Sequence, residues 1–157
     1  MTGDPPPAPA HPLGTRLGYL LKHAQAQLAE ASARALEPYG VDGRELAVLA
    51  VLAADTEPVA APLSQSDAAH RLGVDRTTMV ALVDALEGKG LVERQRSAQD
   101  RRRNAVRLTP AGHDLRRRAE AARQEMERHF LAPLPAEDAA AFVRALQTLA
   151  LPRPSKA

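Results

Sequence analysis

The chain has 157 residues, 45% of them hydrophobic and 25% charged, which is the composition of one ordinary globular domain. Aromatic residues make up only 3% and cysteine is absent, which excludes disulfide scaffolds, thiolate metal sites and modules that stack bases on an aromatic platform. The net charge is only +2, yet residues 94–118 hold nine Arg against two Asp. Such a concentration of positive charge is typical of a protein that binds a polyanion, most often a nucleic acid, although it also occurs on solvated helix faces.

The composition of the two ends of the chain indicates tails rather than targeting segments. Residues 1–12 are rich in proline and lack the basic and apolar regions of a secretory signal. No apolar run approaches the roughly 20 residues that span a bilayer. We therefore expect a soluble, cytoplasmic protein with flexible tails at 1–12 and 152–157, and a folded region over 13–151.

Two helices are expected first. Over 13–36, apolar residues recur at steps of three and four, which predicts a long helix with one apolar stripe. Residues 38–40 contain Pro and Gly and end it. Asp42 followed by Glu45 forms a capping pattern, so a second helix should run from there to about residue 54, with apolar residues on most of its faces.

A helix-turn-helix is predicted next. Ser64 can cap a short helix that reaches Leu72, Gly73 turns the chain, and Asp75 can cap a further helix over 76–89. At 100° per residue, the apolar side chains of that last helix share one sector, which should be buried. These side chains are Met79, Leu82, Val83 and Leu86.

The opposite face of helix 76–89 carries small and hydroxylated residues, including Thr77, Ala81, Asp84 and Gly88. A helix with such a face can enter the major groove of DNA without steric obstruction. The simpler alternative is a solvated face. The candidate DNA contacts of the helix-turn-helix are Ser64, Arg76, Thr77, Thr78, Val80 and Ala81.

A β-hairpin, or wing, is predicted after the helix-turn-helix. Residues 91–96 and 105–109 are short alternating stretches on either side of a polar, Arg-rich loop. Three neighbouring guanidinium groups at Arg101, Arg102 and Arg103 repel one another and cannot be buried, so we interpret them as contacts to a polyanion rather than as a solvated loop. Asp100 is interpreted as an orienting partner for one of them.

Two more helices are expected, over 110–131 and 136–150, the first capped by Thr109 with Pro110 in its first turn. Their apolar faces and the stripe on helix 13–36 lie outside the compact winged region of about 43–109, so they need a partner surface. A homodimer provides one, and a monomer that folds these helices back on itself is the alternative. The predicted fold class is mainly α with a small β-hairpin wing, a winged helix-turn-helix flanked by dimerisation helices.

Two segments resemble the MarR family of bacterial winged helix-turn-helix regulators. These segments are LSQSDAAHRLGVDRTTMVALVDALEGKGLVER at 63–94 and DRRRNAVRLTPAGHDL at 100–115, and the resemblance extends over roughly 13–149. It implies that Asp100 orients Arg102, that Arg102 enters the minor groove, and that Arg101 and Arg103 contact phosphates.

The resemblance also implies a homodimer with intertwined first, fifth and sixth helices, which represses transcription from a pseudopalindromic operator in double-stranded DNA. Such regulators often respond to a small aromatic or anionic effector in the cleft between the dimerisation helices and the winged region. The implied effector-binding residues are Arg16, Tyr19, Leu20, His23, Leu46 and Leu49. The lack of cysteine departs from the peroxide-sensing branch of the family.

Two other classes of protein, an enzyme and an architectural DNA-binding protein, fit the sequence less well. We expect no enzyme, because the sequence has no Gly-rich phosphate loop or nucleophile elbow, and no catalytic residue is assigned. No cofactor or metal is expected, since the five His residues show no i, i+4 pairing. The more serious rival is a non-specific or architectural DNA-binding protein without an effector, but such a protein has little need of base-contacting groups on helix 76–89.

Overall fold

The computed structural model describes residues 12–54, 63–96 and 104–151. Over these ranges the chain is mainly helical with one antiparallel hairpin, β1-β2, so the predicted fold class is confirmed. The elements in chain order are α1 (Leu17–Leu36), the short 3-10 helix η1 (Glu37–Tyr39), α2 (Gly43–Ala54), α3 (Gln65–Leu72), α4 (Arg76–Gly88), β1 (Val92–Arg96), β2 (Asn104–Leu108), α5 (Pro110–Leu131) and α6 (Ala136–Ala150).

The first helix begins at Leu17, whereas the apolar spacing predicts a start at residue 13. Residues 12–15 form a turn, in which the Arg16 N–H donates to the carbonyl of Leu13 at 3.0 Å. Arg16 is the N-cap of α1, and its side chain carries no acceptor for the free N–H groups of the first turn. The helical stripe therefore starts one turn later than the apolar spacing indicates.

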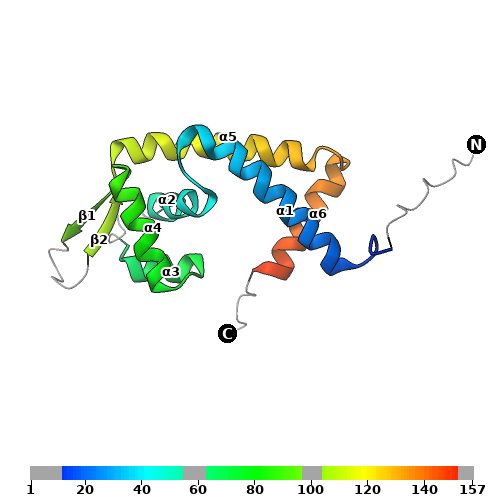
Figure 1. The fold of residues 1–157 in the computed structure, drawn as a ribbon, viewed down its shortest axis with the longest axis horizontal. Helices are drawn as coiled ribbons and strands as arrows, with labels where there is room; N and C mark the ends of the chain where they lie inside the picture. Colours follow the sequence, from blue (N-terminus) through cyan, green and yellow to red (C-terminus); the bar gives the residue numbers. More distant parts are fainter. Residues whose placement is uncertain (1–11, 55–62, 97–103, 152–157) are drawn as a thin grey trace, which may run out of the picture.

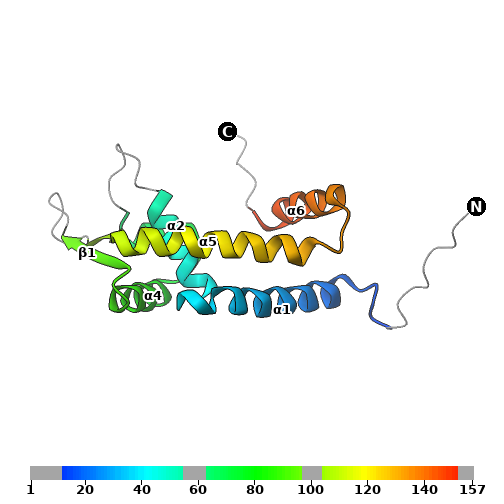
Figure 2. The same ribbon diagram turned by 90° about the horizontal axis from the view of Figure 1, so that it is seen from above.

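The molecule has two parts joined by the long helix α5 (Figures 1 and 2). One end holds α2, α3, α4 and the hairpin, and we call residues 41–109 of the described chain the winged unit. The other end holds most of α1, the second half of α5, and α6, and we call residues 12–35 and 120–151 the arm. Seen from above, α1 and α6 lie on opposite sides of α5 (Figure 2).

The hydrophobic core lies in the winged unit and in the parts of α1 and α5 that pack against it. Its fully buried large side chains are contributed by the end of α1, by α2 and by α4, and they are Leu36, Val48, Leu49, Met79, Val83 and Leu86. The three from α4 belong to the sector that the sequence predicts to be buried, and Leu82 packs partly buried against them. Burial of each such side chain stabilises the fold by about 1.5–3 kcal/mol.

The hairpin is fixed to this core at its base. Val92 pairs with Leu108 and Arg94 with Val106 across the two strands. Val92 and Val106 are buried, and the Val106 N–H donates to the carbonyl of Leu63 just before α3. The hairpin is therefore part of the same packed unit as the helix-turn-helix.

Gly112 explains the close packing between the start of α5 and the end of the helix-turn-helix. A Cβ at this position would lie 2.0 Å from the carbonyl oxygen of Leu91, so only glycine fits. Thr109 caps α5: its hydroxyl accepts from the Gly112 N–H at 3.0 Å and donates to the carbonyl of Gly90 at 2.7 Å. These contacts give the residues 108–112, Leu-Thr-Pro-Ala-Gly, a structural role at the junction of wing and arm.

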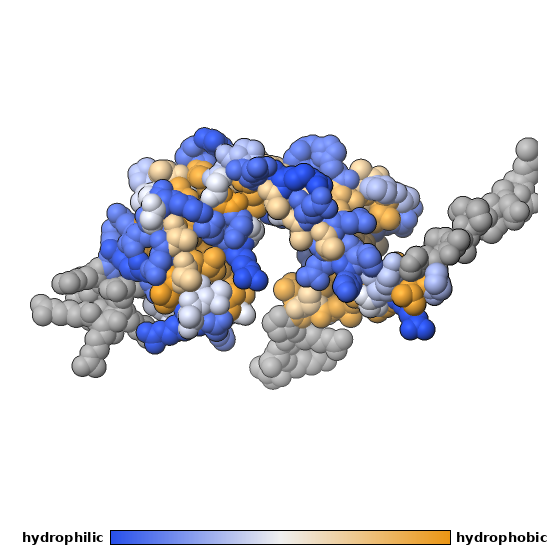
Figure 3. Space-filling view, viewed as in Figure 1, coloured by the Kyte–Doolittle hydropathy of each residue, from blue (hydrophilic) through white to orange (hydrophobic). Residues whose placement is uncertain are grey.

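The arm has no comparable core. In the part of the chain that the structure describes, every residue of α6 keeps some exposure, and α6 packs little against the other helices. Among the described residues, the large exposed apolar side chains are in this arm: Leu17, Leu20, Leu21, Leu134, Phe142, Val143, Leu149 and Leu151. The space-filling view shows apolar surface at the α6 end of the molecule (Figure 3).

Candidate nucleic-acid interface

The turn between α3 and α4 has the geometry of a helix-turn-helix. Gly73 ends α3 in the left-handed conformation, with a φ of 65° that favours glycine. Asp75 then caps α4, because its carboxylate accepts from the Thr78 N–H at 2.9 Å and from the Thr78 hydroxyl at 2.6 Å. These hydrogen bonds, the hydroxyl first, lower the pKa of Asp75. The Thr78 hydroxyl proton is thus used within the cap.

The outer face of α4 is exposed at several positions, as the sequence predicts. Thr77, Ala81 and Gly88 are exposed, and Arg76 is exposed at the first turn. Val80 is half-buried at the edge of this face. The structure therefore places four of the predicted contact positions, Arg76, Thr77, Val80 and Ala81, along one accessible side or its edge.

Ser64 has a different local role. Its hydroxyl donates to the Asp67 carboxylate at 2.6 Å and accepts from the Asp67 N–H at 3.2 Å, which together form a capping box at the start of α3. The side chain is half-buried and serves the helix cap. Contact with DNA at Ser64 stays a prediction.

The tip of the predicted wing, with Asp100, Arg101, Arg102 and Arg103, lies outside the described residues. The two strands that carry it are described, and they form the antiparallel hairpin that the alternating sequence predicts. The roles assigned to these four residues stay predictions.

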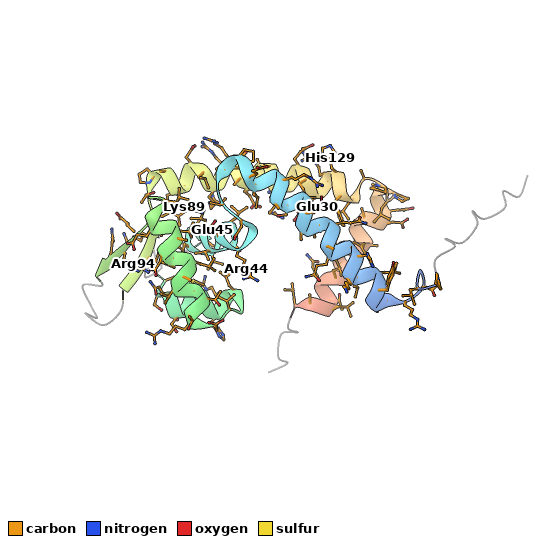
Figure 4. All side chains as sticks on the ribbon, viewed as in Figure 1. Glu30, Arg44, Glu45, Lys89, Arg94 and His129 are labelled. Atoms are coloured by element: carbon orange, nitrogen blue, oxygen red, sulfur yellow. The ribbon has the colours of Figure 1, made fainter. Side chains whose placement is uncertain are left out.

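Sequence reasoning missed Arg94, which links the wing to α4. Arg94 lies on β1 beside α4 (Figure 4). Its guanidinium forms ion pairs with Asp84 and Glu87 of α4, and its backbone N–H donates to the Glu87 carboxylate at 3.3 Å. Burial acts to lower the pKa of Arg94, but the hydrogen bond to Asp84 and the charges of the two carboxylates outweigh it and raise the pKa. The available signal was the strand alternation, which puts residue 94 on the same side as the buried Val92.

Lys89, just after α4, is a second link that the sequence did not reveal. Its ammonium donates to both oxygens of the Glu45 carboxylate, at 2.6 and 2.8 Å, and to the carbonyl of Gly40 at 2.8 Å (Figure 4). Glu45 is buried, and it also accepts from the Asp42 N–H, as the predicted capping pattern requires. Lys89 thus ties the end of α4 to the corner between α1 and α2.

The six predicted effector residues fall into two groups within one chain. Arg16, Tyr19, Leu20 and His23 lie around the first turns of α1, where the rings of Tyr19 and His23 are 4.1 Å apart between centroids. Leu46 and Leu49 are buried in the core of the winged unit at 2% and 0% exposure. The first turns of α1 lie at the end of that helix that is far from α2 (Figure 1). A single chain therefore does not bring the two groups together.

Within residues 12–54, 63–96 and 104–151, no three His, Asp or Glu side chains gather as a metal site would require. None of the helices in these ranges has the length and apolar character needed to cross a membrane.

The chain was also compared with known proteins. A family model described as MarR family matches residues 39–103. A putative transcriptional regulatory protein for the hcr operon of Thauera aromatica is 42% identical over 72 residues, which are 46% of this chain and 43% of that protein. The chain covers less than half the length of the curated relatives it matches.

Solved structures match over nearly the whole chain. The transcriptional repressor CouR, bound to a 23-mer DNA duplex, is 33% identical with a TM-score of 0.77, and the match covers 85% of this chain and 92% of that one. The PcaV transcriptional regulator of Streptomyces coelicolor, in complex with its natural ligand, is 31% identical with a TM-score of 0.73 and coverages of 90% and 96%. Together with the helix-turn-helix and hairpin described above, these matches show that the chain belongs to the MarR family of transcriptional regulators.

Proposed function

We propose that this protein is a sequence-specific DNA-binding regulator that acts as a homodimer and represses transcription by occupying a pseudopalindromic operator. The observation that carries the proposal is the accessible outer face of α4, held by a buried inner face and flanked by a hairpin whose connecting loop is rich in Arg. Blocking a promoter requires only occupancy of the site, and the structural relative CouR is a repressor bound to a DNA duplex.

The face of α4 suits the major groove. Arg76 stands at the N-terminal turn, where it can donate to guanine N7 and O6, and Thr77 and Ala81 are small enough to allow close approach to the base edges. The loop arginines Arg101, Arg102 and Arg103 would then contact the minor groove and phosphates, with Asp100 orienting Arg102. Substitution Arg102→Ala should cost about 1–3 kcal/mol of operator binding.

The apolar surface of the arm supports the homodimer. Leu17 of α1 is 68% exposed and Leu149 of α6 is 78% exposed, and Phe142 and Val143 lie on the same helix as Leu149. An isolated chain would leave these side chains in water, which is unfavourable for so many neighbouring apolar groups. A second copy would cover them and place two α4 helices on successive major grooves, about one helical turn apart.

An effector site is the finer part of the proposal. Arg16 and His23 are exposed on the first turns of α1 beside Tyr19 and Leu20, a combination that suits a small aromatic or anionic molecule. PcaV, a structural relative, has been solved with its natural ligand. Leu46 and Leu49 would contribute only the apolar floor of such a pocket, since both are buried.

The experiment is a fluorescence-anisotropy titration against duplexes that tile the promoter region upstream of the gene, with random duplex as competitor at about 150 mM salt. A sequence-specific regulator should bind one tile at two protomers per duplex, with an affinity roughly 10³-fold or more above its affinity for random duplex. Equal, salt-sensitive binding to every tile would favour an architectural DNA-binding protein instead. Unchanged operator affinity at a saturating concentration of each candidate aromatic acid would contradict the effector site.

A further inference from the structure

The outer face of α4 carries negative charge where DNA would approach. Asp84 lies on the same side as Thr77 and Ala81, and Glu87 follows one turn later; both are exposed. Unneutralised carboxylates on this face would repel the phosphates that flank the major groove. The winged unit therefore needs a cation close to these two groups if α4 is to approach DNA.

Arg94 provides that cation from within the protein. Strand β1 places its side chain on the same side as Val92, which is buried against the core, and the guanidinium reaches Asp84 and Glu87 together. Only 23% of the Arg94 side chain is exposed, whereas the two carboxylates are 59% and 40% exposed. The guanidinium is thus largely covered, and its donors are directed at protein oxygens.

We propose that Arg94 is a positioning residue for DNA recognition, which clamps the wing to α4 through Asp84 and Glu87, neutralises those carboxylates, and contacts no phosphate itself. This inference rests on the proposed DNA-binding function. The planar guanidinium suits the task because it can bond two carboxylates at once, which a lysine ammonium does as a single point charge. The clamp sets the angle between wing and recognition helix, and hence whether minor-groove and major-groove contacts form together.

The binding test compares Arg94→Met with Arg107→Met on the operator duplex across a range of salt concentrations. Arg107 lies on the exposed side of β2 opposite Glu93, so its variant removes the same unit charge from the hairpin without touching α4. R94M should lower operator affinity about tenfold, the factor expected for a lost charged hydrogen bond, and the loss should shrink as salt rises, because salt screens the repulsion between the uncompensated carboxylates and the phosphates. A loss in R94M no larger than that in R107M would reflect only the removal of one positive charge and would overturn the proposal.

Rescue separates positioning from simple destabilisation. In the triple variant Asp84→Asn, Glu87→Gln, Arg94→Met, the uncompensated carboxylates are gone but the wing is still unclamped, so affinity should return part of the way to the wild-type value. Arg94→Lys should fall between R94M and the wild type. Failure of the triple variant to recover affinity, or R94M binding as tightly as the wild type, would each overturn the proposal.

A DNA-free measurement keeps the clamp testable if the wild-type protein binds no operator. Hydrogen exchange of the amides in 84–96 should be faster in R94M than in the wild type, because the Arg94 N–H donates to Glu87 and the guanidinium holds the strand on the helix. Equal exchange rates would refute the clamp. Failure of the wild type to bind any tile would refute the proposed function instead, so the two failures are distinguishable.

Discussion

The winged unit and the arm differ in the range of their polar contacts. In the winged unit, Lys89 bonds Glu45 and Gly40 across more than forty residues, and Arg94 joins a strand to α4. Among the described residues of the arm, the ion pairs join side chains three or four positions apart on one helix, as in Arg34–Glu30 and Arg123–Glu127. The winged unit is thus fixed by its own tertiary contacts, whereas the arm has local pairs and exposed apolar residues.

The two parts are stabilised in different ways. A local ion pair on an exposed helix contributes only a few tenths of a kcal/mol, so it cannot fix a tertiary arrangement. The winged unit has a buried core of its own, but the arm leaves Leu149 and Leu151 largely exposed. We expect mutations in the winged unit to act on folding of the single chain, and those in the arm to act on assembly.

The largest expected effect is that of Gly112→Ala at the junction of the two parts. Its Cβ would lie 2.0 Å from the Leu91 carbonyl oxygen, so strand, turn or helix must shift, at about 3 kcal/mol or more of unfolding free energy. Chemical denaturation measures the change. Gly88→Ala is the matched control, since nothing lies within 4 Å of its Cβ, and it should be neutral or stabilising by up to about 1 kcal/mol.

Phe142→Glu should disrupt assembly while leaving the winged unit folded. A charge on the apolar side of α6 cannot be buried against a second copy, so the protein should become monomeric and lose about 100-fold in operator affinity, as binding falls to one half-site. Sedimentation and circular dichroism report the two quantities. Thr148→Glu, on the opposite side of α6, is the control and should remain dimeric; monomeric wild-type protein would contradict the assignment of the arm.

Lys89→Met should weaken the winged unit at its link to α1. The substitution leaves the Glu45 carboxylate, only 8% exposed, and the Gly40 carbonyl without their long-range donor, at about 2 kcal/mol of unfolding free energy. Lys22→Met removes an exposed lysine of α1 and should change stability by less than about 0.5 kcal/mol. Equal effects of the two variants would show that the Lys89 contacts add nothing to stability.

The smallest effect concerns pH and the cap of α4. The hydrogen bonds from Thr78 lower the pKa of Asp75 below its ordinary 3.8 in the folded state, so the ionised cap stabilises the fold above that value. This contribution is lost as the pH falls through the folded pKa. Asp75→Asn keeps a capping side chain that does not titrate, so its melting temperature should fall less steeply than that of the wild type between pH 4 and pH 2. Parallel pH profiles would show that Asp75 does not contribute to acid unfolding.

Much of the fold follows from local signals in the sequence. The caps at Ser64, Asp75 and Thr109, the turn at Gly73 and the apolar sector of α4 all lie within a few residues of the structures they specify. These signals predict the helix-turn-helix and the start of α5 because capping and amphipathic spacing depend on neighbouring residues. The start of α1 was less predictable, because the apolar spacing extends N-terminal to Leu17, where the helix begins, and Arg16 provides no side-chain cap that would mark the boundary.

The order of the helices, the strands of the hairpin and the exposed face of α4 could be predicted from the sequence, because each depends on local capping, alternation or periodicity. The folded structure was needed to find the partners of Arg94, the burial of Glu45 beside Lys89, and the separation of Arg16 and His23 from Leu46 and Leu49. These features depend on how distant segments pack. Many charged residues along the chain offer equally suitable partners, and only the fold brings particular ones within bonding distance.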